Sequence, residues 1–186
     1  DKSEMVSQLL FGESFTILEK QKHWSKIKIA FDDYEAYIDN KQFEEISEIE
    51  FLKLKENNYT YSGEIIDFIS NESNHFFTIP LGSRLPFFSN NEFEINTKKF
   101  RFEGNIISGQ LPKSEIIQKA FIFLNTPFLW GGKTPFGIDC SGFTQMVYKL
   151  CGYQLYRDAN QQAKQGEGLS FIEESEPGDL AFFDND

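Results

Sequence analysis

Short runs of alternating apolar and polar residues fill the first part of the chain. Three of them, at residues 15–18, 24–29 and 36–38, are separated by turn-like segments. Alternation with a period of two predicts half-buried strands, and several short strands at such close spacing predict a small barrel. We therefore expect a first β barrel over residues 1–48.

A second set of strand-like runs follows a charged stretch of mixed Glu and Lys. This stretch, residues 43–58, is interpreted as a connection with one or two strands. The runs beyond it predict a second barrel over residues 49–110. They lie at residues 64–68, 75–80, 85–88 and 93–95. These segments are rich in phenylalanine and have few basic residues between, so packing explains the aromatic side chains better than nucleic-acid binding does.

The last part of the chain changes to helical periodicity. Two apolar stripes with i, i+3, i+4 spacing predict helices. The stripes consist of Ile117, Ala120, Phe121 and Leu124, and of Phe143, Met146, Val147, Leu150 and Cys151. Ser114 can cap the first helix, and Gly152 ends the second. A polar helix at residues 157–165 and a strand at 180–183 complete an α+β chain whose third domain spans residues 111–186.

Cys140 stands at the start of the second of these helices. Gly137 interrupts the preceding segment, and Asp139 is available as the N-cap. The thiol is therefore expected in the first turn, where unpaired backbone N–H groups and the positive end of the helix dipole favour a thiolate. That is the position of a nucleophile, and a small buried cysteine is the alternative. Gly131 and Gly132 nearby are expected to allow close backbone approach or positive φ.

The second cysteine, Cys151, lies eleven residues further along the same helix. At roughly 1.5 Å per residue the two thiols are about 16 Å apart, which is beyond disulfide reach. No spacing of Cys and His resembles a zinc site. Cys151 belongs to the apolar stripe and is expected in the core.

Composition fits a globular chain and argues against several classes of protein. The 186 residues are 40% hydrophobic and 25% charged, enough to bury a core. The formal net charge of −11 repels nucleic-acid backbones and anionic membranes, and it attracts cationic groups such as a free amino terminus or a diamino acid side chain. An acidic surface that only aids solubility is the alternative. No apolar run approaches the length of a membrane span.

Several motifs around Cys140 occur in a definite order. They are TPFLWGGKTPFGIDCSGF at residues 126–143, RDA at 157–159, QQ at 161–162 and PGDLAFF at 177–183. Together they resemble the NlpC/p60 family of bacterial cell-wall cysteine peptidases. The resemblance implies a papain-like core in which Cys140 is the nucleophile of an amide hydrolase. It also implies peptides of bacterial peptidoglycan as substrates and no cofactor, because a thiolate and general acid–base catalysis do the chemistry.

The same resemblance assigns substrate contacts near the nucleophile. Asp139 and Ser141 are expected to hold the free amino terminus of the substrate, with a pure helix cap as the alternative for Asp139. Arg157 and Asp158 are expected to line the cleft, and an exposed ion pair at a helix start is the alternative for these two. Trp130 precedes the nucleophile loop and is a further candidate for substrate contact.

Residues 3–13 resemble the second strand of a bacterial SH3-like domain whose first strand is absent, and both barrels are expected to be SH3-like. In related enzymes the first barrel closes one end of the cleft, so that only peptides with a free N-terminal L-alanine fit. Glu13 and Tyr34 are the matching polar candidates, and a surface turn is the alternative. The implied reaction is hydrolysis of the γ-D-glutamyl bond to meso-diaminopimelate or lysine, with release of L-alanyl-D-glutamate.

The family's catalytic histidine is expected after a turn at residues 184–186. His23 and His75 lie far upstream and are poor candidates for the base. We therefore expect a fragment of a longer bacterial enzyme, truncated within its papain-like domain. A cytoplasmic location is expected rather than a periplasmic or secreted one. A non-catalytic module that binds wall peptides or a partner is the alternative.

Overall fold

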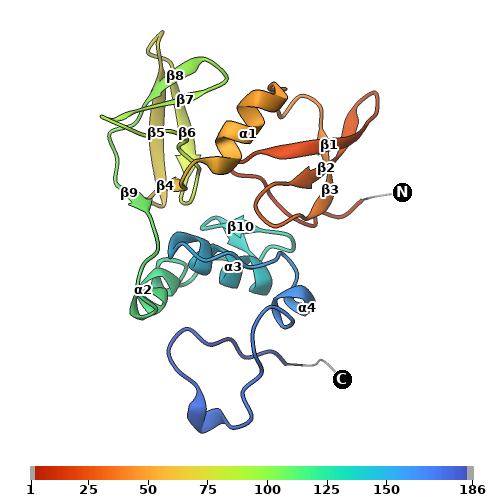
Figure 1. Ribbon diagram of the computed structural model, residues 1–186, viewed down its shortest axis with the longest axis vertical. Coiled ribbons are helices and arrows are strands. Elements are labelled where there is room, and N and C mark those ends of the chain that lie inside the picture. The colour runs from red at the N-terminus through yellow and green to blue at the C-terminus, as the bar shows by residue number, and fades with distance from the viewer. Residues whose placement is uncertain (1–2, 184–186) are drawn as a thin grey trace. The chain divides into compact units, whose positions relative to one another are not determined.

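The computed structural model describes residues 3–183 (Figure 1). These residues form two compact units. Residues 8–109 make up one unit, and the described residues up to Ser7 join those from Gln110 onward in the other. The turn expected at residues 184–186 lies outside the described residues, and the division into three domains stays a prediction.

The first sheet of the unit 8–109 has the order β1-β2-β3 with antiparallel pairing (Figure 1). Its strands are β1 (Phe15–Lys20), β2 (Trp24–Ile29) and β3 (Glu35–Asp39). Alternate residues of β2 are buried, as expected for a half-buried strand. Ile27 and Ile29 belong to a buried hydrophobic cluster. The three strands predicted from alternation are confirmed.

The connection at residues 43–58 contains α1 (Glu48–Glu56), so the expectation of one or two strands there is wrong. The Ser47 side chain accepts a hydrogen bond from the Glu50 N–H at 3.2 Å. Acidic residues occupy the first turn and lysines the last. A serine N-cap and this order of charges both favour a helix. The Leu54 side chain of this helix is buried.

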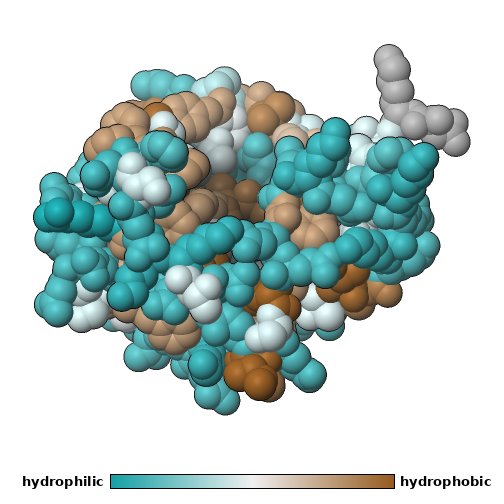
Figure 2. Space-filling view, turned by 90° about the horizontal axis from the view of Figure 1, so that it is seen from above, coloured by the Kyte–Doolittle hydropathy of each residue, from teal (hydrophilic) through white to brown (hydrophobic). Residues whose placement is uncertain are grey.

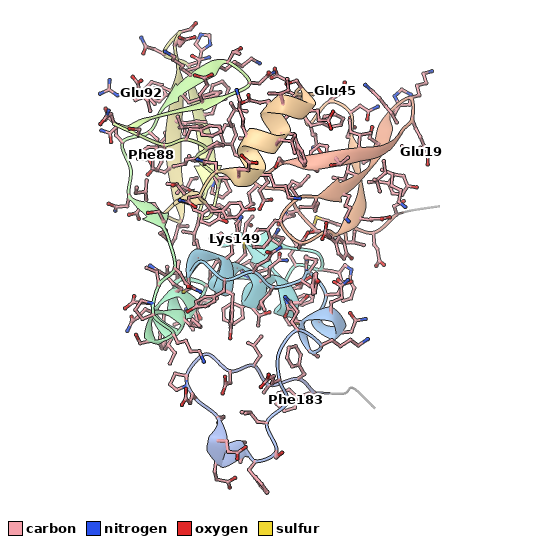
Figure 3. All side chains as sticks on the ribbon, in the orientation of Figure 1. Glu19, Glu45, Phe88, Glu92, Lys149 and Phe183 are labelled. Atoms are coloured by element: carbon pink, nitrogen blue, oxygen red, sulfur yellow. The ribbon has the colours of Figure 1, made fainter. Side chains whose placement is uncertain are left out.

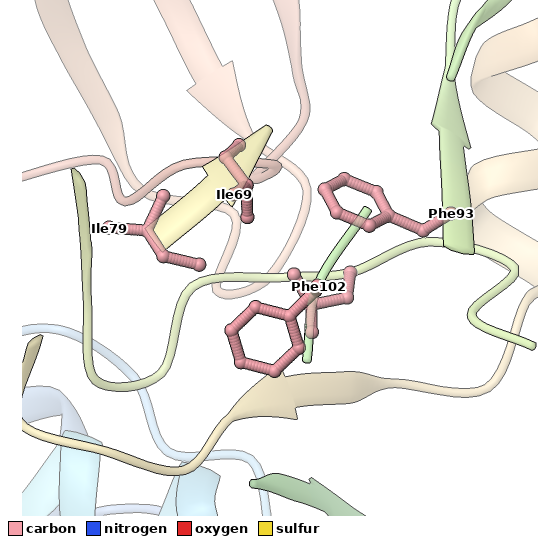
Figure 4. Packing of buried hydrophobic residues seen from close by; sticks show 5 residues of the cluster. Ile69, Ile79, Phe93 and Phe102 are labelled. Carbon is pink, nitrogen blue, oxygen red and sulfur yellow. The ribbon is translucent and has the colours of Figure 1, made fainter. Parts of the chain in front are cut away.

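The second sheet has the order β6-β5-β8-β7, also with antiparallel pairing. Its strands are β5 (Ile66–Asn71), β6 (Phe76–Pro80), β7 (Glu92–Ile95) and β8 (Lys98–Arg101). A separate pair consists of β4 (Thr60–Ser62) and β9 (Ile106–Ser108). Figure 4 shows the hydrophobic cluster of this region, which includes Ile69, Ile79, Phe93 and Phe102.

The phenylalanines of this region are only partly in the core. Phe93 and Phe102 are buried, whereas Phe68 and Phe76 are 56% and 72% exposed. Successive residues of a strand face opposite sides, so Phe68 and the buried Ile69 lie on different faces of β5. The face of the molecule seen in Figure 2 is mainly hydrophilic, with groups of apolar side chains among the polar ones. Packing explains only part of the aromatic content.

One further expectation for this unit is wrong, and the strands β4, β8 and β9 are not among the expected ones. Residues 85–88 form no strand, because Pro86 has no N–H to donate and Phe87 has φ +56°, outside the strand region. The lysine-rich β8 is missing from the expected strands, because it lacks a clear apolar alternation. Within residues 3–183 the strands form open sheets, so the presence of two SH3-like barrels stays a prediction.

The other unit is built around helices. It contains α2 (Ser114–Ile122), β10 (Lys133–Thr134), β11 (Gly137–Ile138), α3 (Cys140–Leu150), α4 (Ala159–Gln162) and the 3-10 turn η1 (Ile172–Glu174). Met146 and Leu150 of α3 are fully buried, which confirms the predicted stripe. Lys149 of the same helix, labelled in Figure 3, is also buried.

The start of α2 differs from the expected capping by Ser114. The carbonyl groups of Pro112 and Lys113 already accept hydrogen bonds from the N–H groups of Glu115 and Ile116. Lys113 has helical backbone angles and occupies the N-cap position without a side-chain hydrogen bond. Ser114 therefore lies inside the first turn and does not cap it.

The last elements are shorter than the sequence predicts. The helix expected at residues 157–165 is limited to α4, with Asp158 as its N-cap and turns after it. The strand expected at 180–183 does not form, because no described residue pairs with it and strands are stabilised by their ladder partners. A papain-like sheet on α3 stays a prediction.

Among residues 3–183 no helix is both long enough and apolar enough to cross a membrane.

Candidate active site around Cys140

Cys140 is the first residue of α3, and its side chain is exposed. The expected position of the thiol in the first helical turn is confirmed. Cys151 follows the other end of α3 and is fully buried. Burial raises the pKa of the Cys151 thiol, which keeps it protonated. The interpretation as a structural cysteine therefore fits Cys151 and not Cys140.

The carboxylate of Asp139, the residue before Cys140, joins two parts of the candidate site. Its Oδ1 accepts hydrogen bonds from the Gly142 N–H in the first turn of α3 at 2.6 Å and from the Ser141 hydroxyl at 3.3 Å. Its Oδ2 accepts one from the Gly131 N–H in the preceding loop at 2.8 Å. Asp139 thus caps the helix, as the sequence predicts, and also anchors the loop before it.

Arg157 forms a two-point ion pair with the same carboxylate. Its Nη1 and Nη2 donate to Oδ1 and Oδ2 of Asp139 at 3.0 and 2.7 Å. Nη1 also donates to the Ser141 hydroxyl at 2.9 Å, and Nε donates to the Ser7 hydroxyl at 3.2 Å. The Arg157 side chain is only 1% exposed. The alternative of an exposed ion pair does not fit this residue.

Glycines let the loop before the nucleophile approach its neighbours. Gly131 has φ +75°, and a Cβ there would lie 2.5 Å from the carbonyl oxygen of Met5. A Cβ at Gly132 would lie 2.4 Å from the carbonyl oxygen of Gly137. Both distances are too short for a side chain, so the expected roles of Gly131 and Gly132 are confirmed.

Gln162 connects α4 to the nucleophile helix. Its Nε2 donates to the carbonyl oxygens of Ser141 and Tyr156 at 2.9 and 2.8 Å, and its Oε1 accepts from the Thr144 hydroxyl at 2.6 Å. From the sequence, this buried residue has no predicted role beyond its place in the QQ motif. The available signal was the glutamine pair that follows Asp158, since Gln161 completes a capping box with that residue.

The environment of Asp139 favours its charged form. Burial alone raises the pKa of this carboxyl, but the hydrogen bonds from Arg157 and from the Gly142 N–H, the Arg157 charge and the Gly131 N–H outweigh it and hold the pKa below its ordinary value. A group with a lowered folded-state pKa stabilises the fold above its unfolded pKa, about 3.9 for aspartate. That stabilisation is lost as the pH falls through the folded-state pKa.

We expect the Asp139→Asn variant to show this dependence directly. Asparagine keeps the shape but loses the charge, so the variant is less stable than the wild type at pH 6. The difference in unfolding free energy should shrink as the pH is lowered from about 5 to about 2, where the wild-type carboxyl becomes protonated. Urea unfolding of both proteins at several pH values measures it. If the difference in unfolding free energy between the two proteins stayed constant over this pH range, the lowered pKa of Asp139 would be contradicted.

The other candidates in the unit that contains Cys140, residues 3–7 and 110–183, are partly accessible; this unit is called the catalytic unit below. Trp130 is 61% exposed, in the loop between α2 and α3. Asp158 is half-buried at the start of α4, where its backbone N–H donates to the Gln161 side chain at 3.1 Å. Substrate contacts of Trp130 and Asp158 stay predictions.

Glu13 and Tyr34 belong to the other compact unit. Glu13 accepts a hydrogen bond from the Leu10 N–H at 2.8 Å, and Tyr34 packs against the first hydrophobic cluster. Their substrate contacts stay predictions. His23 and His75 lie in the same unit and are exposed. In the part of the chain that is described, no group of three or more His, Cys, Asp or Glu side chains could hold a metal ion.

Comparison with known families gives two matches within the chain. Residues 125–186 match the NlpC/P60 family, and residues 1–43 match the bacterial dipeptidyl-peptidase Sh3 domain. The resemblance stated from the sequence is therefore confirmed: the chain contains an NlpC/P60 domain and a bacterial SH3 domain.

Relatives agree with these matches over part of their length. The chain is 48% identical over 69 residues to gamma-D-glutamyl-L-lysine dipeptidyl-peptidase of Bacillus subtilis (strain 168), covering 37% of this chain and 23% of the relative. It is 40% identical over 75 residues to dipeptidyl-peptidase 6 of Lysinibacillus sphaericus, covering 38% and 26%. The matched stretches thus span about a quarter of these relatives.

One solved structure shares the fold over most of the chain. The crystal structure of an NlpC/P60 family protein from Bacillus cereus ATCC 10987 matches with a TM-score of 0.78 at 21% identity. The match covers 93% of this chain and 63% of that one. It supports a mixed α and β architecture with SH3-like and NlpC/P60 parts.

Proposed function

We propose that this protein is a bacterial cell-wall peptide hydrolase of the NlpC/P60 type, with Cys140 as its nucleophile. The observation that carries the proposal is an exposed thiol at the first position of α3, next to the buried Asp139 that caps this helix. The NlpC/P60 match covers this residue, and the relatives are named as peptidases.

In the proposed reaction the Cys140 thiolate attacks the carbonyl carbon of a peptide bond. A carbon–sulfur bond forms, the carbon–nitrogen bond breaks, and the leaving amine takes up a proton. Water then hydrolyses the thioester and restores the thiol. Both proton transfers need a general acid–base group, for which the family resemblance implies a histidine, and residues 110–183 contain none.

The bond that we propose is the γ-D-glutamyl linkage to a diamino acid, cleaved with release of L-alanyl-D-glutamate. The name of the Bacillus subtilis relative, gamma-D-glutamyl-L-lysine dipeptidyl-peptidase, supports this choice. The net charge of −11 favours a substrate that carries amines.

The free amino terminus of the substrate needs an acidic partner. The Asp139 carboxylate is already occupied by Arg157 and by backbone N–H groups, which supports the helix-cap alternative for this residue. We therefore assign the ammonium group to Glu13 and Tyr34, with the half-buried Asp158 as a further candidate.

Cleavage of two matched peptides tests the function. The full-length protein should release L-alanyl-D-glutamate from L-Ala-γ-D-Glu-L-Lys, as detected by mass spectrometry. The N-acetylated peptide should be cleaved at least about tenfold more slowly, because a buried or half-buried carboxylate loses its charged partner. Equal rates for the two peptides would contradict the amine requirement. Binding of both peptides without cleavage would favour a non-catalytic module.

A further inference from the structure

We propose that Arg157 is a positioning residue for the nucleophile and that the N-terminal segment, defined here as residues 5–7, is part of the peptidase machinery. The proposal deepens the function proposed above and rests on Cys140 being the nucleophile. In this view Arg157 acts through Asp139 and does not touch the substrate.

The burial and hydrogen bonding of Arg157 carry the first step. Its side chain is 1% exposed, and its Nε, Nη1 and Nη2 atoms all donate hydrogen bonds within the protein. Nη1 serves the Ser141 hydroxyl as well as Asp139. The guanidinium is therefore engaged by groups of the protein itself. Its planar shape lets two of its nitrogens bind the two carboxylate oxygens of Asp139. This geometry favours a positioning role over the expected place in the lining of a cleft.

The second step is the path from Arg157 to the thiol. Asp139 directly precedes Cys140, and its carboxylate also accepts the Gly142 N–H at 2.6 Å and the Gly131 N–H at 2.8 Å. The guanidinium fixes the orientation of this carboxylate, and the carboxylate in turn fixes the first turn of α3. If the orientation is lost, the helix start that presents the thiol loses its cap.

The third step concerns the N-terminal segment. The SH3 match extends over residues 1–43, yet the described residues up to Ser7 pack with the catalytic unit. Ser7 supplies the acceptor for Nε of Arg157 at 3.2 Å. The Met5 carbonyl oxygen lies so close to Gly131 that no Cβ fits there. The segment therefore contacts both the guanidinium and the loop that Asp139 anchors.

The reactivity of Cys140 in the full-length protein tests the proposal without relying on peptide cleavage. The variants are Ser7→Ala and Arg157→Lys, with Ser7→Thr to restore the hydroxyl and Ser3→Ala as a matched control at an exposed serine. The rate of iodoacetamide modification at pH 7.5 is followed by mass spectrometry of the Cys140 peptide. The fully buried Cys151 serves as an internal reference. Thermal unfolding is recorded for every variant.

We expect the Ser7→Ala variant to react about three- to tenfold more slowly, the range that corresponds to loss of one hydrogen bond. Arg157→Lys should react at least about tenfold more slowly, because an ammonium group does not replace the two-point contact. Ser7→Thr and Ser3→Ala should match the wild type. Should Arg157→Lys fail to fold, the Ser7 variants still decide the question.

Unchanged Cys140 reactivity in Ser7→Ala would overturn the proposal, whatever happens to the melting temperature. With peptide substrate, Ser7→Ala should lower kcat and leave KM unchanged. A raised KM with an unchanged kcat would instead mean that Arg157 contacts the substrate, and would overturn the positioning role. Failure of the proposed function would give a different result: the thiol reactivities of the variants follow the expected order, but no peptide is cleaved.

Discussion

The Cys140→Ala variant is expected to lose peptide cleavage, with kcat/KM lowered by at least about 10⁴-fold. The proposed mechanism forms a covalent bond to the Cys140 sulfur, and the adjacent Ser141 hydroxyl is buried and hydrogen-bonded to Asp139 and Arg157. The other cysteine of the chain, Cys151, is fully buried and has a raised pKa. Initial rates of dipeptide release over a range of substrate concentrations measure the effect.

Two features of the fold make this a clean comparison. Cys140 is exposed, so its replacement by alanine leaves no cavity and the melting temperature should change little. Cys151→Ala is the matched control: it should lose about 1 kcal/mol of stability through a small cavity but keep its activity. Loss of a nucleophile costs about 10⁴-fold in rate. If Cys140→Ala retained more than about one hundredth of the wild-type rate, the hydrolase assignment would therefore be wrong.

The nucleophile helix shows what local sequence can predict. The apolar stripe of α3 repeats over the whole helix, Gly137 precedes it and Asp139 caps it, so start, end and buried face all follow from neighbouring residues. The strands β1 to β3 are equally local, because each has its own alternation. For such elements the tertiary structure adds burial and leaves the boundaries nearly unchanged.

The polar contacts of the site are not predictable in this way. Arg157 and Asp158 are adjacent at a helix start, a pattern typical of an exposed ion pair, whereas Arg157 is buried and bonded to Asp139, Ser141 and Ser7. Ser7 and Arg157 are separated by 150 residues, and no local pattern marks either as a partner of the other. Residues whose role depends on long-range contacts therefore need the structure.

Some secondary-structure elements were predicted wrongly because their local sequence signals are weak or because they need a pairing partner. α1 has little apolar periodicity, and its capping serine and charge order are the signals that could have identified it. The expected strand at residues 180–183 has the right composition but no pairing partner among the described residues. Composition alone does not make a strand, because the ladder hydrogen bonds come from a neighbour.

The Gly142→Ala variant is expected to lose both stability and activity, against the usual effect of this substitution. In the interior of an exposed helix, alanine is favoured over glycine by up to about 1 kcal/mol. Here a Cβ would lie 2.2 Å from the carbonyl oxygen of Gly132 and 2.9 Å from Oδ1 of Asp139. Both neighbours are held in place, the first as backbone and the second by Arg157, so α3 must shift. Such overpacking costs about 1–3 kcal/mol, and we expect a net loss of about 2 kcal/mol.

The shift of α3 also displaces Cys140, which lies two residues before Gly142. A misplacement of about 1 Å at a reacting group can cost about 100-fold in rate, so Gly142→Ala should lower kcat by about that factor even where the protein remains folded. Gly166→Ala is the matched control in the same unit, since a Cβ there meets nothing within 4 Å. It should change the unfolding free energy by less than about 0.5 kcal/mol and leave kcat unaltered. Equal behaviour of the two glycine variants, measured by urea unfolding and dipeptide release, would show that the close approach of α3 to the Gly132 carbonyl does not position the thiol.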